Sequence, residues 1–198
     1  MKQNKSVLLA FLLLVLTASL YRVWGGRPQG FAPQLAMAIF GGAVIQNKKL
    51  ALFLPLLSML FSDLVYQVLY VKGLSTIPGF YAGQVENYAL IAGLTCFGFL
   101  MKKVTALRVL GFAISGSLLF FLLSNFSVWL AGAGFHHPKT FDGLLACYGD
   151  ALVFYRDYGL IHGFAANFIL GDIFFCFVLF GTYELLNRYV VQPKRQLA

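Results

Sequence analysis

The chain has 198 residues, of which 60% are hydrophobic and only 11% are charged, and its formal net charge is +8. Water-soluble domains carry about a quarter charged residues, so this composition, with a mean hydropathy of +0.78, excludes an ordinary soluble domain and predicts an integral membrane protein. The positive charge does not call for nucleic acid as a partner, because Lys and Arg at a membrane surface face anionic lipid headgroups.

Six apolar stretches are predicted to form membrane-spanning helices, since a span needs about 20 mostly apolar residues. They are residues 7–24, 31–45, 50–71, 88–101, 107–130 and 162–186. The second and fourth stretches are short and are expected to extend into their flanking loops. The longest gap, residues 131–161, is too short for a soluble domain. We therefore predict a single all-α polytopic domain over residues 1–198.

The basic residues predict the orientation, because they gather on the cytoplasmic side of membrane proteins. With the N-terminus inside, ten of the 15 basic residues lie in inner segments: Lys2, Lys5, Lys48, Lys49, Lys102, Lys103, Arg108, Arg188, Lys194 and Arg195. The outer segments hold Arg22, Arg27, Lys72, Lys139 and Arg156. This distribution favours six spans with both termini in the cytoplasm.

The first two stretches raise separate questions. Lys2 and Lys5 before residues 7–20 are also typical of a signal peptide, but no small-x-small cleavage site precedes Arg22, so a retained helix is the better interpretation. The second stretch contains small residues at spacings that permit close helix contact, namely Ala32, Ala36, Ala38, Gly41 and Gly42. The pattern leaves open whether that contact lies within the chain or with another subunit.

Polar side chains occur inside the third, fifth and sixth stretches, where they are costly and often functional. Asp63 is predicted in the outer half of its span and Asn125 at a similar level, with Trp129 one turn further out. In the sixth span, Asn167 is predicted near the outer side and Asp172 near the middle. These residues could line one hydrated hollow, which Asp63 and Asp172 would share. Alternatively, each could bond locally and only fix helix packing.

The outer mouth holds the nearest cations. Arg22 and Arg27 lie between the first two spans, and an Arg27–Asp63 pair is a prediction of this layout. Two acids near one Arg favour a cationic or zwitterionic ligand over a polyanion.

The last outer loop contains a predicted amphipathic helix, residues 141–158, with Leu144, Leu145, Tyr148, Leu152 and Tyr155 on roughly one face. It is too polar to span and is expected to lie on the outer surface or over the mouth of the bundle. His136 and His137 are adjacent, unlike a metal pair at i, i+4. The cysteines Cys96, Cys147 and Cys176 show no metal or redox spacing. No metal and no cofactor is predicted.

Several short blocks carry a resemblance to a known family. They are residues 30–43 (GFAPQLAMAIFGGA), 54–56 (LPL), 62–64 (SDL), 120–129 (FFLLSNFSVW), 140–144 (TFDGL) and 171–172 (GD). Over residues 27–182 the chain resembles an uncharacterised bacterial family of six-span membrane proteins (DUF6580-like). That family is similar in layout to the substrate-binding (S) components of energy-coupling-factor (ECF) vitamin transporters. Gly30 departs from the family pattern, which usually has Asn before the Phe-x-Pro, so any ligand contact from that Asn is missing here.

The resemblance implies an outward-facing small-molecule site in the bacterial cytoplasmic (inner) membrane. It also implies helices that dock on a transmembrane coupling subunit with ATPases, since the chain has no Walker motif of its own. The ligand-binding positions would be Arg27, Asp63, Asn125, Trp129, Asn167 and Asp172.

Three functions remain open. The leading one is capture or transport of a vitamin-like metabolite as an ECF S-component-like subunit. The second is a structural or accessory membrane protein without a ligand. The third, an intramembrane enzyme, is disfavoured because Ser115-Gly116-Ser117 lacks a His at matching depth and Asp172 lacks the glycine pattern of intramembrane aspartyl proteases. The chain is therefore not expected to be an enzyme.

Overall fold

The computed structural model describes residues 5–28, 30–132, 137–157 and 167–187, and the side chains of residues 5–13, 153–157 and 167 lie outside that description. The described residues form helices and no strands, which confirms the all-α prediction at this level. The helices are α1 (Lys5–Val23), α2 (Gln34–Val44), α3 (Lys48–Val71), α4 (Gln84–Gly98), α5 (Ala106–Ala131), α6 (Phe141–Asp157) and α7 (Asn167–Leu186).

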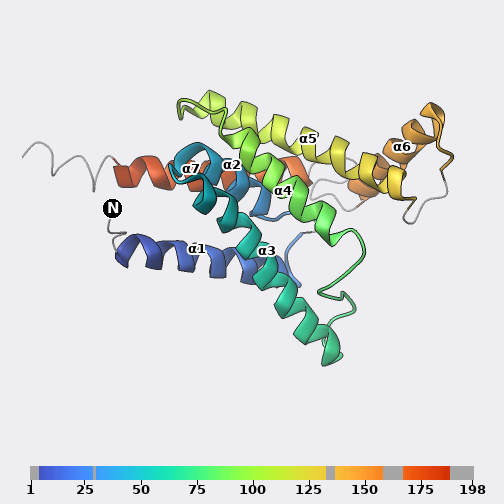
Figure 1. The fold of residues 1–198 in the computed structure, drawn as a ribbon, viewed down its shortest axis with the longest axis horizontal. Helices are drawn as coiled ribbons and strands as arrows, with labels where there is room; N and C mark the ends of the chain where they lie inside the picture. The colour runs from blue at the N-terminus through green and yellow to red at the C-terminus, as the bar shows by residue number, and fades with distance from the viewer. Residues whose placement is uncertain (1–4, 29, 133–136, 158–166, 188–198) are drawn as a thin grey trace, which may run out of the picture.

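Figure 1 shows α1, α5 and α7 running along the long axis of the molecule, while α3 crosses obliquely and its C-terminal end projects from the bundle. α6 lies beside the C-terminal end of α5, at the end of the molecule opposite the start of α1. Each of the six predicted apolar stretches contains a helix. The predicted start of the last stretch, residues 162–166, and residue 158 of the predicted outer helix lie outside the described residues.

Local chemistry determines where several helices begin and end. The Asn47 side chain accepts hydrogen bonds from the backbone N–H groups of Lys49 (3.1 Å) and Leu50 (3.2 Å) at the start of α3. Thr105 caps α5 through the N–H of Arg108 at 3.4 Å. Such caps satisfy N–H groups that have no partner within the helix. Gly132, with φ of 71° in the left-handed region, ends α5.

α2 is short and lies at the centre of the bundle. Its 11 residues span about 16 Å at 1.5 Å per residue, against a hydrocarbon core of about 30 Å. It begins only after Pro33, because a proline disfavours helical backbone in the preceding residue, and eight of its residues are buried. The predicted stretch 31–45 is therefore helical only in its later part.

The small residues of α2 are used within the chain. A Cβ on Gly42 would lie 2.2 Å from the carbonyl oxygen of Thr95, and one on Gly98 of α4 would lie 2.6 Å from that of Ile39. The two backbones therefore approach closely, as small residues allow in membrane helix pairs. On the other side, Gly116 of α5 leaves room for the Ile39 side chain. The small-residue stripe thus packs α2 against α4 and α5 of the same chain.

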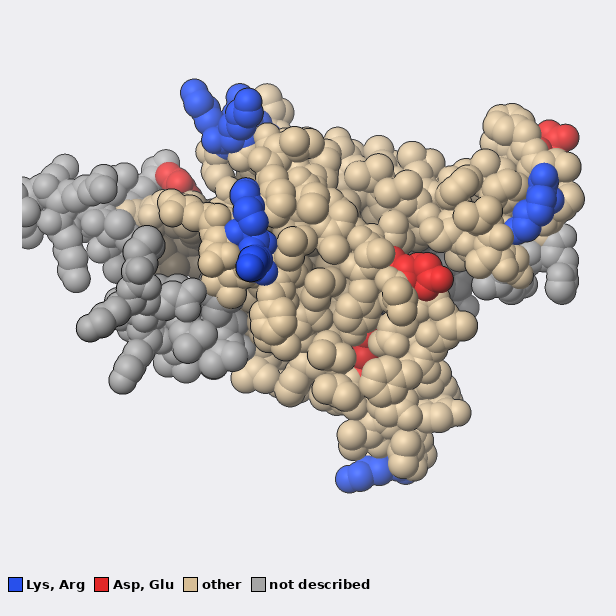
Figure 2. Space-filling view, viewed as in Figure 1, with Lys and Arg blue, Asp and Glu red and all other residues tan. Residues whose placement is uncertain are grey.

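Within the described residues, three helices are long and apolar enough to cross a membrane: α3, α5 and the part of α7 from Phe168. Large apolar side chains on them stand exposed, including Leu64, Val68, Leu118, Leu122, Phe174 and Val178. Exposed apolar surface on this scale marks a lipid or protein interface. Figure 2 shows a largely uncharged surface, with Lys and Arg toward its edges and left part and small acidic patches near its middle. Residues 14–23 of α1, and α2, are shorter apolar helices.

Candidate functional site

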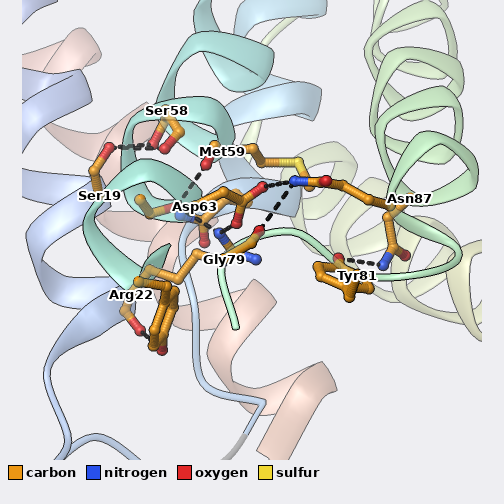
Figure 3. Close-up of polar contacts among 12 residues, drawn as sticks. Ser19, Arg22, Ser58, Met59, Asp63, Gly79, Tyr81 and Asn87 are labelled. Atoms are coloured by element: carbon orange, nitrogen blue, oxygen red, sulfur yellow. Dashed lines mark hydrogen bonds and ion pairs between the residues drawn. The ribbon is translucent and has the colours of Figure 1, made fainter. Parts of the chain in front are cut away.

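Asp63 of α3 is only 1% exposed, and its carboxylate lies in a hydrogen-bond network. Its Oδ1 forms an ion pair with the guanidinium of Arg22 from α1. Its Oδ2 accepts hydrogen bonds from Gln84 Nε2 at 2.7 Å and from the Tyr88 hydroxyl at 2.8 Å, both from α4 (Figure 3). Because both oxygens have partners, this carboxylate is satisfied within the protein. The network ties three helices together.

The cation that pairs with Asp63 is Arg22, so the expected Arg27–Asp63 pair is not what the structure places there. Arg22 also donates to Ser62 Oγ at 2.5 Å. Its backbone carbonyl accepts from the Tyr66 hydroxyl (2.9 Å) and from Arg27 Nε (2.7 Å). Arg22 lies in the last turn of α1, whereas Arg27 lies in the loop that follows the helix, and it is the Arg22 guanidinium that reaches Asp63.

The loop between α3 and α4 is held against the same network. Gln67 Oε1 accepts from the N–H groups of Gly79 (3.1 Å) and Phe80 (3.3 Å). A Cβ on Gly79 would lie 1.9 Å from the carbonyl oxygen of Asp63, so this close approach requires glycine. The surroundings of Asp63 therefore fix the fold of this region and leave no open side for a ligand.

A separate cavity of 270 Å³ lies beside this network, between the α1–α2 loop and α2, α3, α4, α5 and α7. Of the predicted site residues, it brings together Arg27 and Asp172. The lining also includes the following side chains: Arg22, Ala32, Gln34, Leu35, Met59, Tyr81, Asn87, Ile91, Phe120 and Phe168. Its volume is near the lower end of small-molecule sites, about 300 Å³.

Asp172 of α7 is 4% exposed and lines this cavity. Its Oδ2 accepts a hydrogen bond from Ser117 Oγ of α5 at 2.5 Å. No Lys or Arg among the described residues forms an ion pair with it. Asp172 therefore differs from Asp63, and the two acids do not share one cavity.

Gln34 and Asn87 are cavity residues that the sequence analysis did not single out. Gln34, at the start of α2, is 6% exposed and its Nε2 donates to the carbonyl of Ala18 at 3.4 Å. Its Oε1 has no hydrogen-bond partner among the described residues. Asn87 Nδ2 donates to the Tyr81 hydroxyl at 2.9 Å (Figure 3). A polar amide within an apolar stretch, as at Gln34, is the signal that could have identified it.

Asn125 and Trp129 are not among the residues that line this cavity, and their side chains bond to backbone carbonyls. Asn125 Nδ2 donates to the carbonyl of Phe121 in its own helix at 2.8 Å. Trp129 Nε1 donates to the carbonyl of Pro138 at 3.0 Å, and Lys139 lies over its ring. The Asn167 side chain lies outside the described residues.

α6 packs on the C-terminal end of α5, and its predicted place on the outer surface of the membrane stays a prediction. The Tyr148 hydroxyl donates to the carbonyl of Leu122 at 2.9 Å, and Cys147 Sγ contacts the carbonyl of Asn125 at 3.7 Å. Burial and, to a smaller degree, the charge of Asp150 raise the pKa of the Cys147 thiol. His137 Nε2 lies 2.9 Å from Asp150 Oδ2. His136 is outside the described part of the chain, in which no group of three His, Cys, Asp or Glu side chains could hold a metal ion.

Gly30 adopts φ of 77° at the rim of the cavity. A Cβ there would lie 2.4 Å from the Phe168 ring. Phe168 therefore fills the space that an asparagine at position 30 would need. This explains in physical terms how the chain accommodates its departure from the Asn-Phe-x-Pro pattern.

Comparison with protein families gives a match that covers almost the whole chain. The model of a family of unknown function (DUF6580) matches residues 2–195. Neither a curated protein nor a solved structure matches the chain.

Proposed function

We propose that this protein, which belongs to DUF6580, a family of unknown function, captures a small molecule within a membrane helix bundle. Because the family has no known activity, the proposal is argued from the cavity alone. The observation that carries the proposal is the cavity in which Arg27, Gln34 and Asp172 meet. A mostly apolar hollow with a few convergent polar groups is the usual form of a small-molecule site.

The polar groups of the cavity support binding more than packing. Gln34 and Asp172 are more than nine-tenths buried, yet one amide oxygen lacks a partner and the acid has only a hydroxyl partner among the described residues. Leaving buried polar groups unsatisfied costs about 1–3 kcal/mol each. A ligand that bonds to them would offset this cost.

The proposed arrangement has six spans, with both termini in the cytoplasm of a bacterium and the cavity in the outer half of the inner membrane. The lining by the non-helical segment before α2 supports this placement. Non-helical backbone at membrane depth is tolerated where it is buried in protein or lines a hydrated cavity.

The layout also supports an S-component-like role, in which the ligand is released inward with the help of a partner. The chain has no phosphate-binding loop, so energy for transport would come from a transmembrane coupling subunit with ATPases. The proposal includes no reaction, no metal or cofactor, and no nucleic acid.

A second candidate function is a structural or accessory membrane protein. The observation that favours it is the closed network around Asp63, in which every polar atom of the carboxylate serves helix packing. Asn125 and Trp129 are likewise bonded to backbone carbonyls.

Native mass spectrometry of gently purified protein tests the two functions against each other. Capture predicts a retained small molecule in the wild-type protein and its loss in Ala32→Phe, which places a ring in the cavity. Ala89→Phe adds the same ring at an exposed position of α4 and serves as the matched control.

Retention of the molecule in Ala89→Phe but not in Ala32→Phe would support capture. Equal retention in both variants would mean that the molecule binds elsewhere. No retained molecule, together with no small-molecule effect on the melting temperature, would favour the structural role. The same spectra would report any co-purifying coupling subunit.

A further inference from the structure

The charged groups of the cavity are opposite in sign and are not paired with each other. Asp172 receives one hydrogen bond, from the neutral Ser117 hydroxyl at 2.5 Å. Its side chain is only 4% exposed. Asp63, in contrast, is paired with Arg22. A buried carboxylate without a cation is strongly unfavourable. A positive group of a ligand in the cavity would stabilise the charged form of Asp172.

Arg27 provides the opposite sign at another part of the wall. Its Nε donates to the carbonyl of Arg22 at 2.7 Å and its Nη1 to that of Pro28 at 3.5 Å. Both are backbone partners, and no carboxylate among the described residues pairs with it. The guanidinium is half-buried and has further N–H groups that suit an anionic oxygen.

The N-terminus of α2 adds to the attraction for an anion. This 11-residue helix begins after Pro33 without a side-chain cap, and Ala32, Gln34 and Leu35 line the cavity. The unpaired N–H groups and the dipole at a helix N-terminus favour negative charge.

Gln34 supplies an independent sign that a ligand is missing from the wall. Its Oε1 is buried without a partner in the described part of the chain. Exchanging the amide O and N would not repair this, because the oxygen would then face the carbonyl oxygen of Ala18, which now accepts from Nε2 at 3.4 Å. Two residues of the cavity lining thus carry buried acceptors, Gln34 with its unpartnered Oε1 and Asp172 with its carboxylate.

An apolar side chamber adjoins the acid. It is a hollow of 170 Å³ between α5, α6 and α7, and it shares Phe120, Phe168 and Asp172 with the main cavity. The rest of its lining is Ser117, Leu118, Phe121, Leu152 and Ile169. A ligand bound at Asp172 could place a hydrocarbon or aromatic group there.

We propose that the ligand is a small zwitterion with an apolar substituent, of amino-acid-like chemistry. Its ammonium group lies at Asp172 and Gln34 Oε1, its carboxylate lies at Arg27 and the start of α2, and its apolar group enters the side chamber. This inference rests on the proposed function, because it names the chemical class that the cavity captures.

Four probes with one common body test the class: phenylalanine, phenethylamine, 3-phenylpropionate and 2-phenylethanol. Phenylalanine carries both charges, phenethylamine only the positive charge and 3-phenylpropionate only the negative charge. 2-Phenylethanol carries no charge. Dissociation constants are measured by calorimetry on the full chain in detergent. We expect phenylalanine to bind at least tenfold more tightly than either singly charged probe, and 2-phenylethanol to bind most weakly.

Two variants separate the charges. Asp172→Asn should weaken phenylalanine and phenethylamine about tenfold or more and leave the affinity for 3-phenylpropionate within about twofold. Arg27→Gln should have the reverse pattern. If either variant does not give a folded, monodisperse protein, the other carries the test against the same four probes.

The results distinguish this inference from the proposed function. If 2-phenylethanol binds as tightly as phenylalanine, or if a variant weakens all four probes equally, the zwitterion class is wrong while capture stands. If no probe binds but native mass spectra show a retained molecule, the chemistry of that molecule decides. A retained zwitterion would support the proposed class, and a retained neutral molecule or polyanion would overturn it. If no probe binds and nothing is retained, both proposals fall.

Discussion

Asp63 and Asp172 both lie inside predicted spans, where an acid disfavours membrane insertion, but their surroundings differ. Asp63 has a cation and two neutral donors, so its charge is balanced where it lies. Asp172 has one hydroxyl donor among the described residues. Since an acid in the middle of a spanning helix costs about 2.5–3.5 kcal/mol on insertion, the first is compensated within the fold and the second has a reason to meet a ligand.

The Arg22–Asp63 pair should be asymmetric in its effect on stability. Removing Arg22 in Arg22→Gln leaves Asp63, 1% exposed, without a cation and unable to reach water. Removing the acid in Asp63→Asn leaves Arg22, 18% exposed, which can turn toward solvent. We expect Arg22→Gln to lower the free energy of unfolding by about 3 kcal/mol and Asp63→Asn to lower it distinctly less. Melting temperatures in detergent should show the same order of destabilisation.

The double variant Arg22→Gln/Asp63→Asn is the control for this asymmetry. Without either charge, the buried site holds only neutral donors and acceptors, so the double variant should be at least as stable as Arg22→Gln alone. A double variant less stable than either single variant would show that the charges do not act as a pair. Retained ligand in Asp63→Asn would agree with the place of Asp63 outside the cavity lining.

The thiol of Cys147 offers a test of the packing of α6. Burial and the nearby Asp150 carboxylate raise its pKa above 9.0, and the thiolate is the reactive form. In a background without Cys96 and Cys176, its rate of maleimide modification should therefore still rise with pH beyond 9. Asp150→Asn removes a negative charge, which lowers the pKa and should increase the rate at pH 8.

Asp142→Asn in the same helix is the matched control, because Asp142 is not among the groups that shift this thiol. It should leave the rate at pH 8 unchanged. If Asp150→Asn raised the rate equally at all pH values, the change would reflect exposure of α6 rather than a shifted pKa.

At the scale of elements, α2 determines how the bundle is built. It is too short to span alone, yet it is the most completely buried helix among those described, with Ala36, Met37, Ala38 and Ile39 each fully buried. Isolated helices of this length are marginal, so its stability comes from packing against α3, α4, α5 and α7. Because α2 begins only after Pro33, the segment before Pro33 is free to form the cavity wall.

The contact between α2 and α4 should tolerate no added methyl group at Gly98. A Cβ there would lie 2.6 Å from the carbonyl of Ile39, which is backbone and cannot move aside cheaply. Gly98→Ala should destabilise the protein by about 1–3 kcal/mol. In the same helix, Gly93 has open space around its Cβ position, so Gly93→Ala should be neutral or raise stability by up to about 1 kcal/mol.

Melting temperatures of the two variants in one detergent give the comparison. Equal effects would mean that the close approach of α2 and α4 does not contribute to stability. A loss only in Gly98→Ala would support the contact that the small-residue stripe forms.

The sequence predicts the helices well because they are recorded in long apolar runs and their flanking basic residues. The second run was expected to extend into its flanking loops, but Pro33 delays the helix and α2 covers only Gln34–Val44. The fourth run was expected to extend as well, and α4 does begin before residue 88, at Gln84. The site is harder to predict. Depth counting places Asp63 and an arginine at one level, but it does not show that Arg22, near the end of α1, is the partner while the Arg27 side chain bonds to backbone carbonyls in the loop that follows. Nothing in the pattern shows that the Gln34 oxygen lacks a donor, because that depends on Ala18 from another helix.

At the scale of the whole molecule, the ends differ in chemistry. α6 and the loop that Trp129 holds lie at one end, and the start of α1 lies at the other (Figure 1). Between them, the face in Figure 2 is largely uncharged apart from small acidic patches. Such a band is expected where lipid surrounds the chain, because exposed charge is costly there. The proposed six-span topology assigns α6 to the outside and the Lys102–Lys103 pair to the cytoplasm.

Cysteine labelling in intact cells tests this assignment. In a chain without its native cysteines, Lys72→Cys and Lys103→Cys place single thiols at exposed positions on opposite sides of the proposed membrane. The positive-inside distribution predicts that a membrane-impermeant maleimide modifies position 72 in intact cells and position 103 only after lysis. Both should react fully in detergent, which controls for accessibility. Labelling of position 103 but not 72 in intact cells would reverse the orientation, and the cavity would then open toward the cytoplasm. Labelling of both would contradict the proposed odd number of spans between them.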